Sequence, residues 1–299
     1  INVISRIDDY LNGKIIDDEL DLVHFLNYIK NENYDLEIGN SVIERLSKSY
    51  NERLFRRSME SFYKYLHADN FGKKLALETV NQGEFERFYN HYKQIGQMCN
   101  NDTLNRQYDF IFCMMMKAII IKADKKCCNK VDELVKFCLT ELKCIMINEL
   151  YLLCLYLKNS QDVIKYTFAK FHSSIKNGLE NAVRNSTWDI YHARLIDQEM
   201  SLYDEKTQMV ILPYFATNDS GVKDYWSINP RKMVVIKDNR SINVYSHNIG
   251  DIETMINDKN LYYQIVEPSN QIKRRIEINN INIVEVKTAL LAELKNVTI

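Results

Sequence analysis

Glycine and proline are scarce in this chain, whose 299 residues include eight glycines and three prolines. A turn-rich all-β fold needs more of both, so their scarcity favours long helices. Charge of one sign is not in excess either, because 39 Lys and Arg residues stand against 40 Asp and Glu residues. This balance argues against bulk electrostatic binding to nucleic acid or to an anionic membrane.

Long apolar runs and targeting segments are also missing. No run reaches the roughly 18 residues of a membrane-spanning helix, and no secretory signal stands at the N-terminus. We therefore expect a cytoplasmic protein with no membrane partner. A Gly-rich nucleotide loop and a spaced Cys and His framework for zinc are lacking too. The seven cysteines lie between Cys99 and Cys154, mostly in apolar runs, which is typical of buried reduced thiols.

Three regions differ in their hydrophobic pattern. The first, up to residue 49, begins with the apolar "INVIS", which we interpret as the end of a strand followed by short helices. From residue 50 to 184, apolar residues recur at helical spacing with few breakers, which predicts a bundle of five or more helices. From residue 185 onward, helical segments alternate with apolar strand-like runs such as "QMVILPYFAT" and "KMVVIK".

Apolar strands that alternate with helices are typical of a parallel sheet covered on both faces. The pattern therefore predicts an α/β protein with a discontinuous α/β core formed by residues 1–49 and 185–299. The helical bundle of residues 50–184 would then be an insertion in that core.

Two aspartates occupy positions at which functional groups often gather. Asp189 lies near the start of the helix predicted for "STWDIYHARLIDQEM", and Asp219 directly follows the strand predicted for "QMVILPYFAT". In a parallel α/β sheet, such positions meet at one edge. The alternative for each aspartate is a helix-dipole partner or a turn residue.

The order of these segments resembles that of the PIN-domain nucleases. The resemblance covers roughly residues 1–49 and 185–237. It implies an α/β/α sandwich with a mainly parallel sheet, in which three or four acidic residues at the carboxyl ends of the strands hold Mg²⁺ or Mn²⁺ for RNA cleavage.

Three acidic residues of this chain match the family's motifs. Glu44 matches its early helical glutamate, Asp189 the aspartate that opens a later helix, and Asp219 the acid of its T-x-D element. The resemblance implies that these residues are the catalytic metal ligands. Thr217 and Asn218, within that element, are then candidates for positioning a metal-bound water.

The family's opening motif is D-x-N-[VIL] at the end of the first strand, and this chain begins with "INVIS". Asn2 matches the asparagine of the motif, where it would orient the first acid or the substrate. The matching aspartate would stand immediately before Ile1. Either the sequence begins inside the motif, or this acid is absent.

The implied chemistry suits these residue types. Mg²⁺ prefers oxygen ligands, and a metal-bound water can attack a phosphodiester without a covalent protein nucleophile. Single-stranded RNA is the expected substrate. Its phosphates could contact two basic runs, although such runs are more often solvated helix faces: Arg53, Arg56 and Arg57 in the first, and Lys273 to Arg275 in the second.

Other functions stay open at this stage. Family members include toxins and antiphage effectors, in which the helical insertion would control access, bind a protein regulator or mediate self-association. A catalytically inactive PIN-like protein, whose bundle binds a protein partner, is the main alternative. In a third interpretation the chain is an unrelated helical scaffold and the three acids are helix caps.

Overall fold

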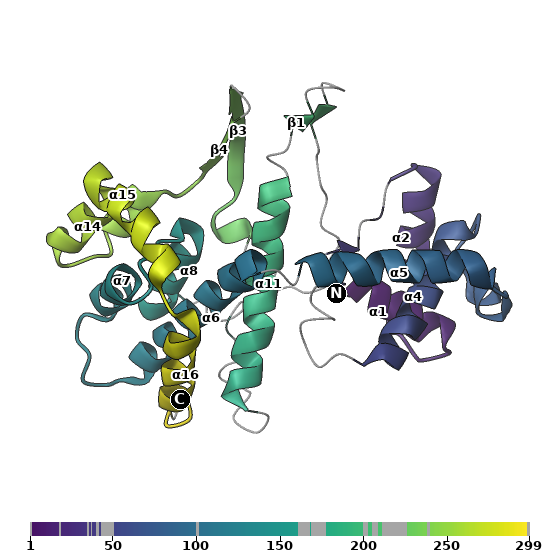
Figure 1. Ribbon diagram of the computed structural model, residues 1–299, viewed down its shortest axis with the longest axis horizontal. Coiled ribbons are helices and arrows are strands. Elements are labelled where there is room, and N and C mark those ends of the chain that lie inside the picture. Colours follow the sequence, from purple (N-terminus) through teal and green to yellow (C-terminus); the bar gives the residue numbers. More distant parts are fainter. Residues whose placement is uncertain are drawn as a thin grey trace. The chain divides into compact units, whose positions relative to one another are not determined.

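The computed structural model describes residues 2–17, 19–34, 36, 38–39, 42, 51–99, 102–160, 168, 178–199, 203–204, 209–210, 226–237 and 240–297. These residues form two compact units, which divide between Leu104 and Asn105. Helices predominate in both units (Figure 1). The division falls inside the segment predicted as one insertion (50–184), and the predicted domain boundaries themselves stay a prediction.

Unit 1 is a small helical assembly. Its described elements are α1 (Asn2–Leu11), α2 (Glu19–Asn31), α4 (Glu52–His67), the 3-10 helix η1 (Lys73–Leu77) and α5 (Gln82–Cys99). α1 and α4 pack against each other, and Ile4, Ile7, Met59 and Phe62 are at most 1% exposed in the core of the unit. Asn51 caps α4 by accepting a hydrogen bond from the backbone N–H of Leu54.

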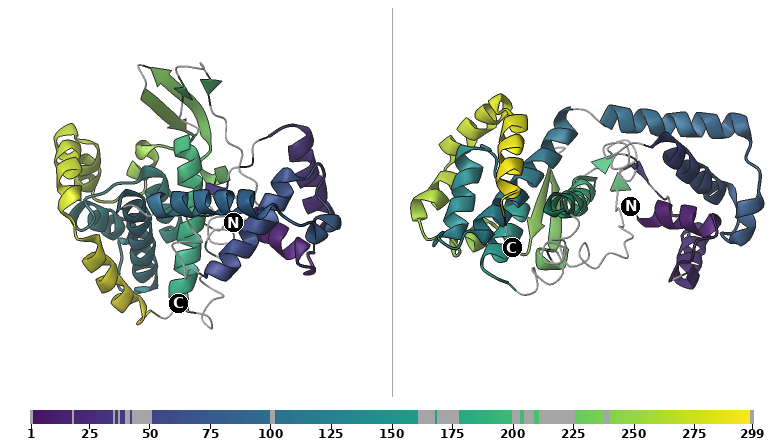
Figure 2. Two further views of the ribbon diagram at one scale, coloured as in Figure 1. Left: turned by 45° about the vertical axis from the view of Figure 1, so that its right-hand side comes forward. Right: turned by 90° about the horizontal axis from the view of Figure 1, so that it is seen from below.

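Unit 2 is larger and also mainly helical. Its helices are α6 (Asp102–Ala123, which begins at the boundary), α7 (Lys130–Thr140), α8 (Ile147–Leu157), α11 (Leu179–Glu199), α13 (Ile249–Glu253), α14 (Lys259–Val266), α15 (Pro268–Glu277), the 3-10 helix η3 (Ile278–Asn280) and α16 (Ile283–Leu294). Its strands are β1 (Tyr203–Asp204), β2 (Met209–Val210), β3 (Arg231–Lys237) and β4 (Arg240–Tyr245). β3 and β4 form a ribbon beside α11 (Figure 2).

The predicted PIN-like α/β/α sandwich with a mainly parallel sheet is wrong. In the described part of the chain, the strands form two separate two-stranded sheets, β1–β2 and β3–β4, and both are antiparallel. "KMVVIK" does form a strand, but β3 is followed after two residues by β4. Such a short connection permits only antiparallel pairing, because parallel neighbours need a crossover of a dozen or more residues.

The N-terminal segment also differs from the prediction. The residues from Asn2 to Ser5 of the "INVIS" run belong to α1 and are not the end of a strand. Ile4, Ile7 and Leu11 recur at helical spacing and all three side chains are buried, so helical periodicity decides the local structure. The other predicted strand, residues 208–217, is described only at Met209 and Val210.

Helix α7 ends earlier than its sequence suggests. The apolar pattern from Lys130 to Met146 predicts a continuous helix, but α7 ends at Thr140. Lys143 has a φ of 49°, in the left-handed region that interrupts a helix. No glycine or proline marks the break. The segment between α7 and α8 is therefore free to form one wall of a pocket.

Candidate functional site

The predicted carboxylate site lies largely outside the described residues. Glu44, Thr217, Asn218 and Asp219 all lie there, and their proposed roles stay a prediction. Asp189 is described, and it lies in the middle of α11, ten residues after the helix begins at Leu179.

The position of Asp189 differs from the predicted position at the opening of a helix. The reason is that the apolar pattern extends upstream, where Val183 is fully buried and Ala182 is 6% exposed. Asn2, the candidate for orienting an acid, is the first residue of α1. Among the described residues, no group of three or more His, Cys, Asp or Glu side chains could hold a metal ion. Binding of Mg²⁺ or Mn²⁺ therefore stays a prediction.

Two of the three arginines predicted to contact RNA are engaged in unit 1. Arg57 donates to Asp8 through Nε (3.1 Å) and Nη2 (2.8 Å), and this hydrogen bonding raises the pKa of Arg57. Arg56 forms a two-pronged ion pair with Glu86, which raises its pKa as well. Arg53 is exposed and has no partner in the described part of the chain. Substrate binding by the three arginines is untested, and Arg53 is the one available without breaking an ion pair.

A second group of charges fixes the β3–β4 ribbon to α11. We call Asp197, Arg231 and Tyr245 the ribbon anchor. The Tyr245 hydroxyl donates to Asp197 Oδ2 at 3.1 Å, and Arg231 Nη2 lies 3.6 Å from Asp197 Oδ1. Burial raises the pKa of Asp197 above its ordinary value, with the charge of Arg231 opposing, and burial also raises the pKa of Tyr245 to about 12.

Next to the anchor on α11, Arg194 donates to both carboxylate oxygens of the buried Glu149 on α8, at 2.9 and 3.1 Å. Both acids are thus held by an arginine, and Glu149 is buried whereas Asp197 is partly buried. Such groups are expensive to bury unless paired, so their arrangement serves to attach elements to each other.

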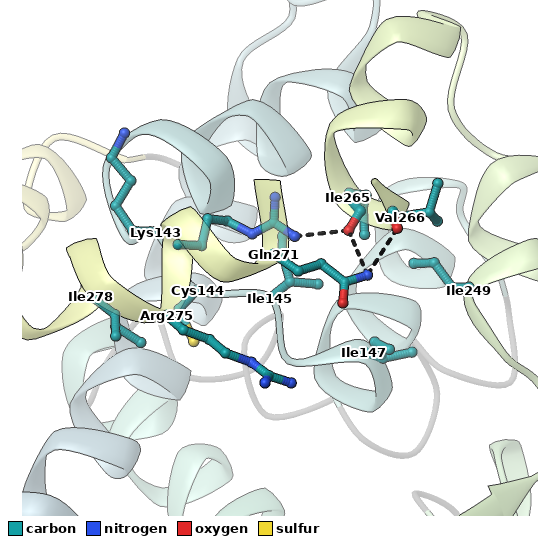
Figure 3. Close-up of a pocket in the computed structure, with 11 residues that line it drawn as sticks. Lys143, Cys144, Ile145, Ile147, Ile249, Ile265, Val266, Gln271, Arg275 and Ile278 are labelled. Carbon is teal, nitrogen blue, oxygen red and sulfur yellow. Dashed lines mark hydrogen bonds between the residues drawn. The ribbon is translucent and has the colours of Figure 1, made fainter. Parts of the chain in front are cut away.

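An open pocket of about 420 Å³ lies elsewhere in unit 2 (Figure 3). This volume is within the range of small-molecule sites, which run from roughly 300 to 1,000 Å³. α14, α15 and η3 contribute to its lining, together with the segment between α7 and α8 and the starts of α8 and α13. The lining residues are Lys143, Cys144, Ile145, Ile147, Ile249, Ile265, Val266, Gln271, Arg274, Arg275 and Ile278.

Most of the polar side chains in this lining have structural partners. Arg274 donates to the backbone oxygens of Gln264 and Ile265, the second at 2.8 Å, and Gln271 donates to that of Val266 at 3.0 Å. These carbonyls end α14 and have no partner within the helix, so the two side chains of α15 complete it.

The remaining cations of the pocket differ in their availability. Lys143 Nζ lies 3.5 Å from Glu277 Oε2. Arg275 is exposed, and no partner for its guanidinium exists among the residues described. In Figure 3 its side chain points away from α15 toward the part of the lining that holds Ile147. The pocket therefore combines isoleucine walls with one available guanidinium.

Cys144 contributes a thiol to the lining of the pocket. Burial raises the pKa of this thiol to about 11; the negative charge of Glu149 adds to the shift, and the positive charges of Arg194, Arg274 and Arg106 oppose it. A thiol with this pKa stays protonated at neutral pH, which excludes a thiolate nucleophile.

Sequence reasoning found part of this site. The sequence predicts Lys273 to Arg275 as a basic run that could contact phosphates, and Arg275 is the member of this run without a partner in the described part of the chain. The isoleucine walls gave no signal, because Ile145, Ile249 and Ile265 come from segments that are far apart in the sequence. Only the tertiary fold brings them together.

Comparison with protein-family models, with curated proteins and with solved structures finds no match for this chain. The resemblance to PIN-domain nucleases consequently stays a prediction that rests on its motifs. Across the described helices, none combines the length and the apolar character that crossing a membrane requires.

Proposed function

We propose that this chain is a binding protein whose unit 2 captures an anionic group attached to an apolar body. The observation that carries the proposal is the pocket of about 420 Å³ with isoleucine walls and the available guanidinium of Arg275. A carboxylate would pair with Arg275, while the apolar body would contact the isoleucines. Arginine is well suited to this task, because its planar fork can donate two parallel hydrogen bonds to one carboxylate.

Binding fits the pocket better than catalysis does. The thiol in its lining, Cys144, has a raised pKa, and Lys143 lies 3.5 Å from Glu277. Gln271 and Arg274 hold the end of α14. No lining residue is a carboxylate or a histidine that could transfer protons. The pocket thus offers affinity and orientation but no acid–base pair.

The test uses octanoate, a carboxylate with an apolar chain, and octanol as its uncharged counterpart. Isothermal titration calorimetry of the full chain should detect octanoate binding and much weaker octanol binding. Replacing Arg275 by Gln should weaken octanoate binding about tenfold or more, since a hydrogen bond between charged groups contributes roughly 1.5–3 kcal/mol. Arg53→Gln is the matched control, because Arg53 is also exposed and lies in unit 1.

Two outcomes would contradict the proposal. One is equal affinity for octanoate and octanol, and the other is unchanged octanoate affinity in Arg275→Gln.

Ribonuclease activity stays a separate proposal, supported by the order of the motifs around Glu44, Asp189 and Asp219. Its test is Mn²⁺-dependent cleavage of labelled single-stranded RNA by the chain and by Asp189→Asn. Cleavage that is lost in the folded variant would support the carboxylate site, and octanoate binding would be unaffected by that substitution. The activity of one site therefore does not decide that of the other.

A further inference from the structure

We infer that the anionic group belongs to a partner protein, on a short acidic amphipathic helix that packs along α15. This inference rests on the proposed function, because it assigns the class of ligand that the same pocket takes. It starts from α15 itself, which has no buried residue although it contains two isoleucines.

The two isoleucines form an exposed stripe beside the pocket. Ile272 is 60% exposed and Ile276 65% exposed, and their spacing of four residues places both on one side of α15. Arg275 follows Ile272 by three residues and Gln271 by four, so it neighbours both on the helix surface. Arg275 therefore lies between the isoleucine stripe and the residues that line the pocket.

The charges around the stripe select an acidic partner. Lys273 and Arg275 follow Ile272 on α15, Lys143 lines the pocket, and Glu277 lies 3.5 Å from Lys143 and 3.7 Å from Lys273. One carboxylate opposite three cations leaves an excess of positive charge. A partner with carboxylates next to apolar residues would complement both the charge and the stripe.

A helical partner fits this surface better than an extended one. A strand binds by pairing with an unpaired sheet edge, and α15 offers none because the hydrogen bonds of a helix run within it. A helix with apolar residues at positions i, i+3 or i+4 and i+7 can instead place one face along Ile272 and Ile276. One apolar side chain of such a helix would enter the pocket, and an acidic neighbour would reach Arg275.

Nucleic acid is the other polyanion that positive charge attracts. Its phosphates would use the cations but gain little from an isoleucine stripe, so the stripe favours a protein. The two partners respond differently to substitutions. Loss of the isoleucines should weaken binding of a helix, whereas it should leave binding of RNA unchanged.

The experiment uses a fluorescein-labelled peptide with leucines at helical spacing and glutamates next to the leucine stripe on the helix surface. A second peptide replaces each glutamate by lysine. Fluorescence anisotropy with the full chain should show binding of the acidic peptide, its displacement by octanoate, and no binding of the basic one. The double variant Ile272→Ser with Ile276→Ser should bind the acidic peptide about tenfold more weakly. Its octanoate affinity should be unchanged, because neither isoleucine lines the pocket.

Leu77→Ser is the matched control, since Leu77 is 87% exposed in unit 1 and its loss should not affect the peptide. Circular dichroism of the double variant checks that the helical fold is retained, and its unchanged octanoate affinity checks that α15 still lines the pocket.

The outcomes separate this inference from the proposed function. Octanoate binding without peptide binding, or equal peptide affinity in the double variant, would overturn the inference and leave the proposed function intact. Binding of labelled single-stranded RNA that competes with octanoate, and that is unchanged in the double isoleucine variant, would overturn the inference in favour of nucleic acid. If neither octanoate nor the acidic peptide bound the chain, the proposed function itself would be contradicted.

Discussion

Replacement of Asp8 by Ala tests whether Arg57 serves the structure of unit 1. The Asp8 carboxylate is 4% exposed and accepts hydrogen bonds from Arg57, Ser61 and Asn12. Arg57 is 41% exposed at its side chain, so water replaces much of its ion pair and we assign that pair only about 1 kcal/mol. Ser61 is buried, and a buried hydroxyl without a partner costs about 1–3 kcal/mol.

These contributions add to a loss of about 3 kcal/mol in the free energy of unfolding of unit 1. With a slope of about 2 kcal/mol per molar urea, the midpoint should fall by about 1.5 M. Both tryptophans, Trp188 and Trp226, lie in unit 2, so their fluorescence follows that unit separately. We expect the transition followed by circular dichroism to gain an early phase while the fluorescence transition stays in place.

The adjacent Asp9 supplies the matched control. It forms an ion pair with Lys14, whose side chain is 56% exposed, and such surface pairs contribute about 0–1 kcal/mol. Asp9→Ala should therefore leave both transitions nearly unchanged. If Asp8→Ala shifted the unfolding of unit 1 no more than Asp9→Ala does, Asp8 would not be a structural anchor and Arg57 would again be a candidate for RNA contact.

Three further predictions concern single side chains. Burial raises the pKa of Asp197 in the folded state above its ordinary value of 3.8, so its ionisation opposes folding increasingly as pH rises from 3.8 through the folded-state pKa. Over this pH range, Asp197→Asn should gain stability relative to the wild type. A difference in stability that stays constant with pH in urea titrations would contradict this. Asp132 is buried and accepts hydrogen bonds from the backbone N–H groups of Asn257 (2.8 Å) and Asp258 (3.2 Å), so Asp132→Ala should cost about 2–3 kcal/mol and increase hydrogen exchange at both amides. Asn33 has a φ of 54°, which glycine adopts freely, so Asn33→Gly should keep the melting temperature or raise it. Asn33→Val should lower the free energy of unfolding by about 1–2 kcal/mol. Equal melting temperatures for the two variants would refute this conformational argument.

The helical character of α4 to α8 was predictable because long apolar stripes carry their own periodicity. The runs "EFERFYNHYKQIGQM" and "QYDFIFCMMMKAIIIKA" each show such a stripe, and they lie within α5 and α6. The sheet was not predictable in the same way, since "KMVVIK" reads as a strand whether its partner is parallel or antiparallel. The two-residue connection between this strand and β4 is the feature that restricts the pair to antiparallel.

The site was predictable only in part, and for a physical reason. The basic run that contains Arg275 is local in sequence, so it could be seen. The end of α7 at Thr140 could not be predicted, because the residue with a positive φ after it, Lys143, is not a glycine. That break releases Cys144 and Ile145 from a helix and makes them part of the pocket. Pockets assembled from separate segments depend on such breaks and on tertiary packing.

The most direct test of the binding function is a methyl NMR titration of the full chain, labelled with ¹³C at its isoleucine methyl groups, with octanoate. Binding in the pocket predicts progressive shifts at Ile145, Ile147, Ile249 and Ile265, and the same shifts only at about tenfold higher octanoate concentrations in Arg275→Gln. Shifts confined to isoleucines of unit 1, or no shifts at all, would contradict the assignment of this pocket as the functional site.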